Sequence, residues 1–289
     1  MSAPAVQASN AAKRFGRVQA LSGVSFSVQP QTITAFLGEN GAGKTTAIKL
    51  VLGFLRPDSG RIGCRGGRIG YVPERPAFFP WLRGRDIITT TGRAYGVGAE
   101  DLAGKIAAMS ARIGFETNLL ERRVPGYSLG NQKKLAFLQN LILAPDILIA
   151  DEPFSSLDPP AIRGVRELFV EMRGEGKTLL LSSHLIGEME RICDRFIILK
   201  RGRVVIEDDL ARLRDNFRFI RPPAGRLRLK APLHEDECVP PLWSRPTPAG
   251  VVALAEKSEA ARLAREAPGS ARVKLEEPTL ESLYFFFTS

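Results

Sequence analysis

The segment that most constrains this chain is glycine-rich and reads Gly38-Glu39-Asn40-Gly41-Ala42-Gly43-Lys44-Thr45. It follows the apolar run 33–37 and precedes residues 46–50, which favour a helix. Glycines let backbone N–H groups point inward around a phosphate, and the start of the next helix adds a favourable dipole. Strand, glycine-rich turn and helix in this order predict a phosphate-binding loop. We expect ATP contacts from Gly38, Glu39, Asn40, Gly41, Ala42, Gly43, Lys44, Thr45 and Thr46.

Within this loop two side chains have distinct expected roles. Lys44 should reach the β- and γ-phosphates, and the Thr45 hydroxyl should ligate Mg²⁺. A second acidic feature supports the metal: Asp151 and Glu152 end the apolar run 147–150. An acid at the tip of a buried strand can hold a hydrated magnesium ion, which we assign to Asp151.

Glu152 stands one residue further on, at the carboxyl end of the predicted strand, where α/β sheets bind ligands. It is the candidate that orients and deprotonates the attacking water. Taken alone, the acid pair would fit a solvated turn equally well. The phosphate loop upstream favours the catalytic interpretation.

Further short motifs occur in a fixed order around these two. Along the chain they are Lys13-Arg14-Phe15-Gly16, Tyr71-Val72-Pro73-Glu74, Tyr127-Ser128-Leu129-Gly130-Asn131-Gln132, Ser155-Ser156-Leu157-Asp158-Pro159 and Leu181-Ser182-Ser183-His184. From about residue 13 to residue 200 the chain therefore resembles the ATP-binding cassette (ABC) transporter ATPases. A single match would be weak, but the ordered set is specific.

The resemblance implies a role for each motif. Phe15 matches the aromatic residue that stacks on adenine, although it could also pack on the sheet. Glu74 stands at the Q-loop as a further Mg²⁺ ligand, and Asp158 lies in the D-loop. His184 matches the switch histidine, which can hydrogen-bond both the γ-phosphate and the carboxylate of Glu152. The expected catalytic set is Glu152, His184 and Lys44.

The signature motif implies a partner. Ser128 and Gly130 would offer a hydroxyl and a bare backbone N–H at a helix start, which suits an anion. In the family this clamp closes on the ATP held by a second subunit. The resemblance therefore implies a head-to-tail dimer with two ATP molecules between the subunits. We expect two copies of this chain, and a heterodimer stays open.

Two positions depart from the usual family pattern. Glu74 replaces the common glutamine and adds a negative charge beside the phosphates. In the signature, Leu129 replaces the first glycine and Asn131 the common glutamine, which could weaken closure and slow hydrolysis. Glu74 and the segment 278–288 resemble the branch paired with type-two ABC export permeases, although 278–288 could also be an ordinary amphipathic tail.

The order of elements predicts an α/β fold: a P-loop NTPase core with a mainly parallel sheet and an N-terminal antiparallel β part. We expect an ATP-binding domain at 1–215 with a helical insertion at about 75–144. Residues 216–289 should form a small α+β accessory domain, with a helix-like stretch at 253–267. Expected strands are 19–28 (broken by turns), 32–37, 68–72, 147–150, 178–182, 195–200 and 203–206.

Composition limits the location and the partners. No apolar stretch is long enough to span a membrane, no export signal is visible, and the three cysteines, Cys64, Cys193 and Cys238, are widely spaced. These features favour a cytoplasmic chain held at the inner face of the membrane by a separate permease. The net charge of +10 concentrates between Arg195 and Lys230, where it fits either an anionic partner or a solvated edge.

Three functions remain as hypotheses. The first is a transporter motor, in which Glu74 and residues 75–85 contact the permease through Phe78, Phe79 and Trp81, unless these aromatic residues are core. The second is a soluble ABC ATPase acting on nucleic acid or ribosomes. One phosphate loop and no sustained heptads argue against it, so we expect no specific nucleic acid. The third is a non-hydrolysing regulator, which the intact Lys44, Asp151, Glu152 and His184 disfavour.

Overall fold

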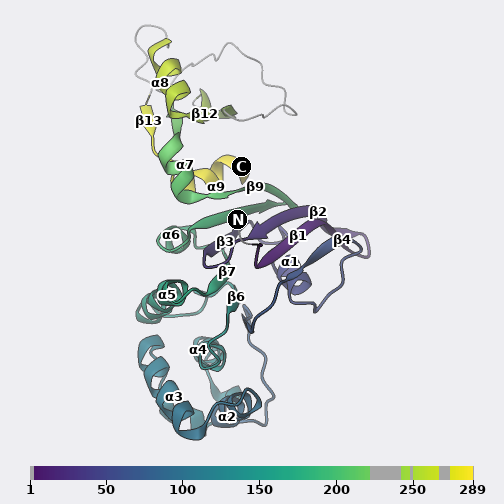
Figure 1. The fold of residues 1–289 in the computed structure, drawn as a ribbon, viewed down its shortest axis with the longest axis vertical. Helices are drawn as coiled ribbons and strands as arrows, with labels where there is room; N and C mark the ends of the chain where they lie inside the picture. Colours follow the sequence, from purple (N-terminus) through teal and green to yellow (C-terminus); the bar gives the residue numbers. More distant parts are fainter. Residues whose placement is uncertain (1–2, 222–241, 248–249, 267–273, 289) are drawn as a thin grey trace. The chain divides into compact units, whose positions relative to one another are not determined.

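The computed structural model describes residues 3–221, 242–247, 250–266 and 274–288, and Figure 1 shows their fold. The chain divides into two compact units, Met1–Glu207 and Asp208–Ser289. The proline-rich stretch after Arg221, the run 226–230 and Cys238 lie outside the described residues. The predicted α/β class is confirmed in the first unit, which holds every motif named above.

A six-stranded sheet forms the centre of the first unit. Its order is β5 (Ile69–Val72), β6 (Ile147–Asp151), β7 (Thr178–Ser183), β3 (Ile33–Leu37), β8 (Arg195–Lys200) and β9 (Arg203–Asp209). The first five strands run parallel to their neighbours. β3, β6 and β7 are buried along their whole length, as expected for strands covered on both faces. Their carboxyl ends therefore meet at one edge.

A separate three-stranded antiparallel sheet has the order β2 (Val18–Val28), β1 (Val6–Phe15) and β4 (Ser59–Cys64). The N-terminal antiparallel part is confirmed, but β1 and β4 were not among the expected strands. β2 also runs without a break, contrary to the expectation for this segment. The interruptions are irregularities in its pairing with β1, including one between Ala8 and Ala11.

Helix α1 (Lys44–Val51) joins the two sheets into one core. Its residues Ala47, Ile48 and Leu50 cluster with the antiparallel sheet and with one face of the central sheet. The aromatic rings of Phe26 and Phe36 meet across this cluster with centroids 5.3 Å apart. Helix α5 (Pro159–Gly174) contacts β3 and β7. The phosphate loop lies between β3 and α1, which are both buried, so it is anchored at both ends in packed structure.

The helical insertion holds α2 (Gly84–Ala94), α3 (Ala99–Ile113) and α4 (Leu129–Leu141), with two short 3₁₀ turns, Thr117–Glu121 and Val124–Gly126. Helix α3 packs on α4 and on α5. Arg112 of α3 forms a two-pronged ion pair with Glu171 of α5, at 2.6 and 2.5 Å. The insertion is thus attached to the central sheet through α4 and α5.

The second unit carries a four-stranded antiparallel sheet in the order β11 (Leu242–Thr247), β12 (Gly250–Glu256), β10 (Phe217–Arg221) and β13 (Lys274–Glu276). Its helices are α7 (Leu210–Asn216), α8 (Lys257–Glu266) and α9 (Leu280–Thr288). The expectation of one helical stretch at 253–267 is wrong in its first part, because residues 253–256 belong to β12. Ala253 and Ala255 are buried there beside Ile220, which favours the strand.

The C-terminal segment forms helix α9 of this second unit. Thr279 and Ser282 cap its first turn reciprocally, each backbone N–H donating to the other side chain at 2.9 and 3.0 Å. Leu280 and Leu283 are fully buried, and the Phe286 ring meets Phe219 of β10 edge to face. Within the described residues, none of the helices is both long enough and apolar enough to cross a membrane.

Candidate active site

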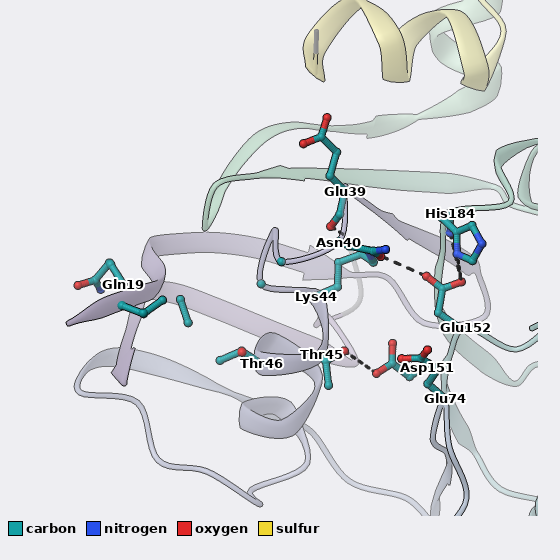
Figure 2. Close-up of a pocket in the computed structure, with 14 residues that line it drawn as sticks. Gln19, Glu39, Asn40, Lys44, Thr45, Thr46, Glu74, Asp151, Glu152 and His184 are labelled. Carbon is teal, nitrogen blue, oxygen red and sulfur yellow. Dashed lines mark hydrogen bonds and ion pairs between the residues drawn. The ribbon is translucent and has the colours of Figure 1, made fainter. Parts of the chain in front are cut away.

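Four loops meet at the carboxyl edge of the central sheet and surround a pocket (Figure 2). They follow β3, β5, β6 and β7, and this is the edge at which open α/β sheets bind ligands. The pocket is lined by Val18, Gln19, Ala20, Glu39, Asn40, Gly41, Gly43, Lys44, Thr45, Thr46, Glu74, Asp151, Glu152 and His184. The first three come from β2 and were missed from the sequence, because only the register of the sheets brings them to the loop.

The loop after β3 is folded around the Lys44 side chain. The Lys44 ammonium donates to the carbonyls of Gly38 and Glu39 at 2.7 and 3.2 Å, and it lies 4.0 Å from the Glu152 carboxylate. Gly41 and Gly43 have φ of 81° and 107°, backbone angles that residues with a side chain rarely adopt. A buried cation in a glycine-rich loop at the start of a helix suits a polyphosphate.

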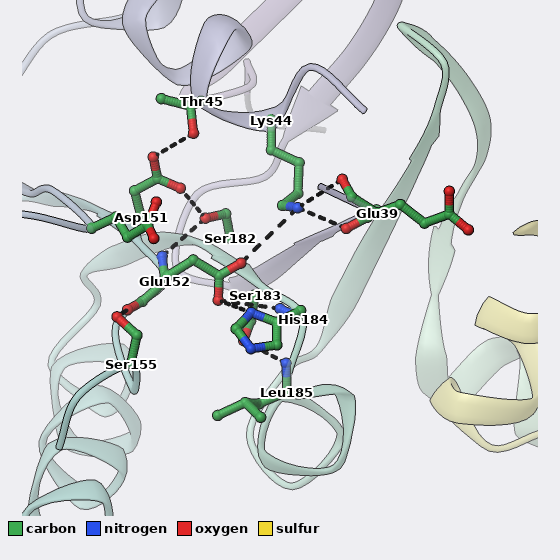
Figure 3. A network of polar contacts seen from close by, with 12 residues as sticks. Glu39, Lys44, Thr45, Asp151, Glu152, Ser155, Ser182, Ser183, His184 and Leu185 are labelled. Atoms are coloured by element: carbon green, nitrogen blue, oxygen red, sulfur yellow. Dashed lines mark hydrogen bonds and ion pairs between the residues drawn. The ribbon is translucent and has the colours of Figure 1, made fainter. Parts of the chain in front are cut away.

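Asp151 is held on both of its oxygens. The Thr45 hydroxyl donates to one carboxylate oxygen at 2.8 Å, and the Ser182 hydroxyl donates to the other (Figure 3). Asp151 is itself almost fully buried at the end of β6. Ser182 was not predicted as a site residue; it stands two positions before His184, at the carboxyl end of β7.

Glu152 and His184 form the second pair of the site. Nδ1 of His184 lies 2.8 Å from one Glu152 carboxylate oxygen, and the backbone N–H of His184 donates to the same oxygen at 3.2 Å. The Glu152 backbone has a φ of 48°, which is costly for a residue with a side chain. Its N–H donates to the carbonyl and to the hydroxyl of Ser182, both at 3.1 Å.

The donor set fits a nucleotide bound with Mg²⁺. Thr45, Asp151 and Glu74 all face the pocket with oxygen atoms, and hard divalent cations prefer oxygen ligands. Within the described part of the chain, no group of three or more His, Cys, Asp or Glu side chains could hold a metal alone. Mg²⁺ is commonly bound through one or two carboxylates together with substrate phosphates, and Asp151 and Glu74 bring two carboxylates to this pocket.

One residue below the pocket was not predicted from the sequence. Lys133 of α4 is 1% exposed, and its ammonium donates to the carbonyls of Pro73, Glu74 and Asp151 at 2.9, 3.0 and 3.1 Å. Burial lowers the pKa of Lys133 to about 8, and the acidic residues nearby oppose that shift only in part. The signal in the sequence was weak: a lysine four residues before Phe137, on the apolar side of a helix.

The signature and D-loop residues lie together, but they do not line the pocket. Ser128 caps α4 by accepting from the N–H of Asn131 at 3.2 Å. A side chain added at Gly130 would lie 2.6 Å from the carbonyl oxygen of Ser156 in the D-loop. Asp158 pairs with Lys134 at 2.7 Å, and this hydrogen bond keeps the pKa of Asp158 below its ordinary value.

Three other expected positions lie off the pocket lining. Phe15, at the end of β1, is half exposed with the Lys13 ammonium 5.7 Å from its ring centre; Val18, its partner in the sheet, does line the pocket. Gly38 and Ala42 belong to the phosphate loop but do not line the pocket. Leu129 begins α4 in helical conformation and is 44% exposed, so its side chain is directed outward.

Comparison with known proteins identifies the architecture. The family model for ABC transporters matches residues 21–155. An ABC transporter ATP-binding protein of Methanocaldococcus jannaschii is 36% identical over 202 residues, a match that covers 70% of this chain and 76% of that protein. The chain belongs to the ABC transporter ATP-binding family. It is accordingly the ATP-binding and ATP-hydrolysing subunit of a transporter.

Other proteins similar to this ABC transporter ATPase support the same family assignment. Nod factor export ATP-binding protein I of Burkholderia lata is 33% identical, over 68% of each chain. A solved ATP-binding subunit of an ABC transporter is 29% identical with a TM-score of 0.65, covering 73% of this chain and 92% of its own. A dimeric bacterial ABC transporter cassette shares the fold, with 21% identity, a TM-score of 0.64 and coverage of 71% and 98%.

Proposed function

We propose that this ABC ATPase hydrolyses Mg·ATP in the pocket of Figure 2, with Glu152 as the base. The observation that carries the proposal is the position of its carboxylate, which His184 contacts on one side and which lies 4.0 Å from the Lys44 ammonium on the other. Lys44 and the N–H groups of its loop bind the phosphates. Thr45, Asp151 and Glu74 would hold Mg²⁺, which neutralises charge on the phosphates when bound.

In the reaction, a water oxygen forms a bond to the γ-phosphorus while the bond from that phosphorus to the β,γ-bridging oxygen breaks. Glu152 accepts the proton of this water, and the products are ADP and phosphate. His184 orients the Glu152 carboxylate through two contacts, one from its ring Nδ1 and one from its backbone N–H. A positioned base of this kind contributes roughly 10²–10⁴-fold in rate.

Glu152→Gln tests this assignment directly. We expect ATPase activity to fall by at least ~10²-fold while Mg·ATP still binds, because the amide keeps the shape of the carboxylate but cannot take the proton. Glu175→Gln, an exposed glutamate at the end of α5, is the matched control and should keep full activity. Hydrolysis that survives in Glu152→Gln would exclude Glu152 as the base.

We further propose a head-to-tail dimer with two ATP molecules at its interface. Ser128, Gly130 and Asp158 are grouped on the chain but do not line its own pocket, which is what a site completed by a second subunit requires. Glu152→Gln with Mg·ATP should therefore sediment as a dimer, alone or with its permease. A species that stays monomeric under both conditions would contradict this assembly.

The membrane partner is proposed to be a separate permease, with the ATPase held at the inner face of the membrane and the cargo moving outward. Phe79 and Trp81, beyond Glu74, are 61% and 64% exposed and stack with ring centroids 5.1 Å apart, which suits an aromatic contact surface. Phe78 is half-buried. Similarity to a protein named for Nod factor export, and the Glu74 branch of type-two export permeases, support export.

Purification from membranes with the associated permease tests this partnership. The double variant Phe79→Ala, Trp81→Ala should lose the permease on purification and keep the ATPase activity of the isolated chain, since neither side chain lines the pocket. Phe54→Ala, an exposed aromatic residue at a different loop, is the control and should retain the permease. Loss of the permease in both variants alike would refute a specific contact at Phe79 and Trp81.

A further inference from the structure

Lys133 lies at a junction of three functional segments. It belongs to α4, the helix that begins after Ser128, and its ammonium reaches the loop after β5 and the end of β6. An ammonium group has three N–H donors and no acceptor. All three donors of Lys133 meet backbone carbonyls between 2.9 and 3.1 Å, and the side chain is 1% exposed.

One of these carbonyls belongs to the peptide that joins Asp151 to Glu152. In a trans peptide the C=O and the N–H point in opposite directions. On one side the C=O accepts from Lys133 at 3.1 Å, and on the other the N–H donates to Ser182 at 3.1 Å. Lys133 and Ser182 therefore hold this peptide plane from opposite sides.

The orientation of this peptide decides where the Glu152 side chain points. Glu152 has a φ of 48°, a conformation that a residue with a Cβ keeps only when its surroundings enforce it. The other two carbonyls, of Pro73 and Glu74, fix the loop whose Glu74 side chain faces the pocket. A single side chain of α4 thus fixes the backbone at two of the acidic residues of the site.

We propose that Lys133 is a positioning residue for ATP hydrolysis, which holds the Asp151–Glu152 peptide and the Glu74 loop in register with helix α4. The inference rests on the proposed role of Glu152 as the base. Because the signature residue Ser128 caps the start of α4, any displacement of its first turns moves the Lys133 ammonium against these carbonyls. Glu152 is then held in its active orientation only while α4 is seated.

The test is Lys133→Met, which keeps the length of the side chain and removes all three donors. We expect kcat to fall at least tenfold, while the Kd for a fluorescent ATP analogue with Mg²⁺ stays within threefold, because the Lys133 side chain does not line the pocket. Lys133→Gln retains two N–H donors and should fall between Lys133→Met and the unaltered chain.

The matched control is Asn140→Leu on the same helix. Asn140 also anchors α4 to backbone, accepting from the N–H of Tyr71 at 2.8 Å and donating to its carbonyl at 3.0 Å, but it does not contact the Asp151–Glu152 peptide. We expect Asn140→Leu to lower the thermal midpoint by a similar amount while kcat stays within twofold. This comparison separates positioning from a general loss of stability.

Two results would overturn the inference. The first is a kcat of Lys133→Met within twofold of the unaltered chain, or of Lys133→Gln should the methionine variant not fold. The second is an equal loss of kcat in Asn140→Leu at the same loss of stability. Failure of the proposed function looks different, because ATPase activity would then persist in Glu152→Gln whatever happens at Lys133.

Discussion

Gly164 of α5 should be a position at which even the smallest added group destabilises the first unit. An added Cβ at this glycine would lie 2.9 Å from the carbonyl carbon of Arg112 in α3, and nearer still to its oxygen. Ordinary contacts between carbon atoms fall at about 3.5–4.0 Å. Helices α3 and α5 would therefore have to separate by about 1 Å, because backbone cannot rotate away as a side chain can.

The size of the effect follows from two opposing contributions. Overpacking a well-packed contact costs about 1–3 kcal/mol, whereas alanine gains up to about 1 kcal/mol over glycine in a helix interior. The net expectation for Gly164→Ala is a loss of about 1–2 kcal/mol. For a unit of this size, such a loss lowers the thermal midpoint by about 2–8 °C.

Gly104→Ala gives the matched control, because Gly104 lies in the exposed middle of α3 and its added Cβ would meet nothing within 4 Å. It should raise the midpoint by about 1–4 °C through helix propensity alone. The assay is thermal unfolding followed by circular dichroism on both variants and the unaltered chain. If Gly164→Ala melts at or above the unaltered chain, the close approach of α3 and α5 does not limit stability and the reasoning fails.

Three further outcomes are expected. Gly130→Ala should weaken ATP-dependent dimerisation and ATPase activity at least tenfold, because its Cβ would lie 2.6 Å from the Ser156 carbonyl; an unchanged dimer by sedimentation would contradict this. Leu283→Ala should destabilise the second unit by about 2–5 kcal/mol, since this side chain is fully buried, and limited proteolysis should show faster cleavage there. Burial raises the pKa of the Cys64 thiol to about 11 from 9.0. The reactive thiolate is then scarce at pH 8, so Cys64 should be alkylated about 100-fold more slowly than in the unfolded chain, the difference shrinking as the pH rises through 11.

Much of this site was accessible to sequence reasoning because its residues are local to strand ends. The loop at Lys44 and the acids Asp151 and Glu152 each follow a run of apolar residues that can only be a buried strand, and parallel strands bring their carboxyl ends together. The structure shows the Thr45 hydroxyl hydrogen-bonded to Asp151 and the His184 ring in contact with the Glu152 carboxylate. The roles proposed for Ser128, Gly130 and Asp158 stay predictions, because they depend on a second subunit.

The parts that sequence reasoning missed depend on tertiary pairing. Strands β1 and β4 carry small, polar and charged residues and lack the β-branched alternation that marks a strand. Their structure depends on pairing within the sheet, where β1 lies between β2 and β4. The start of the expected helix at residue 253 is a strand because its alanines pack beside Ile220. In the sequence Lys133 resembles an ordinary surface lysine, and only the tertiary structure shows the three backbone carbonyls that surround its ammonium.

The backbone torsion of Glu152 has a consequence for engineering. Its φ of 48° costs about 1–2 kcal/mol relative to glycine, which occupies that region freely. A selection for heat resistance alone would thus reward replacement of Glu152 by glycine and discard the carboxylate with the strain. Mutant libraries intended to raise the thermal stability of this ATPase should keep Glu152 unchanged. They should instead vary solvent-facing helix positions such as Gly104.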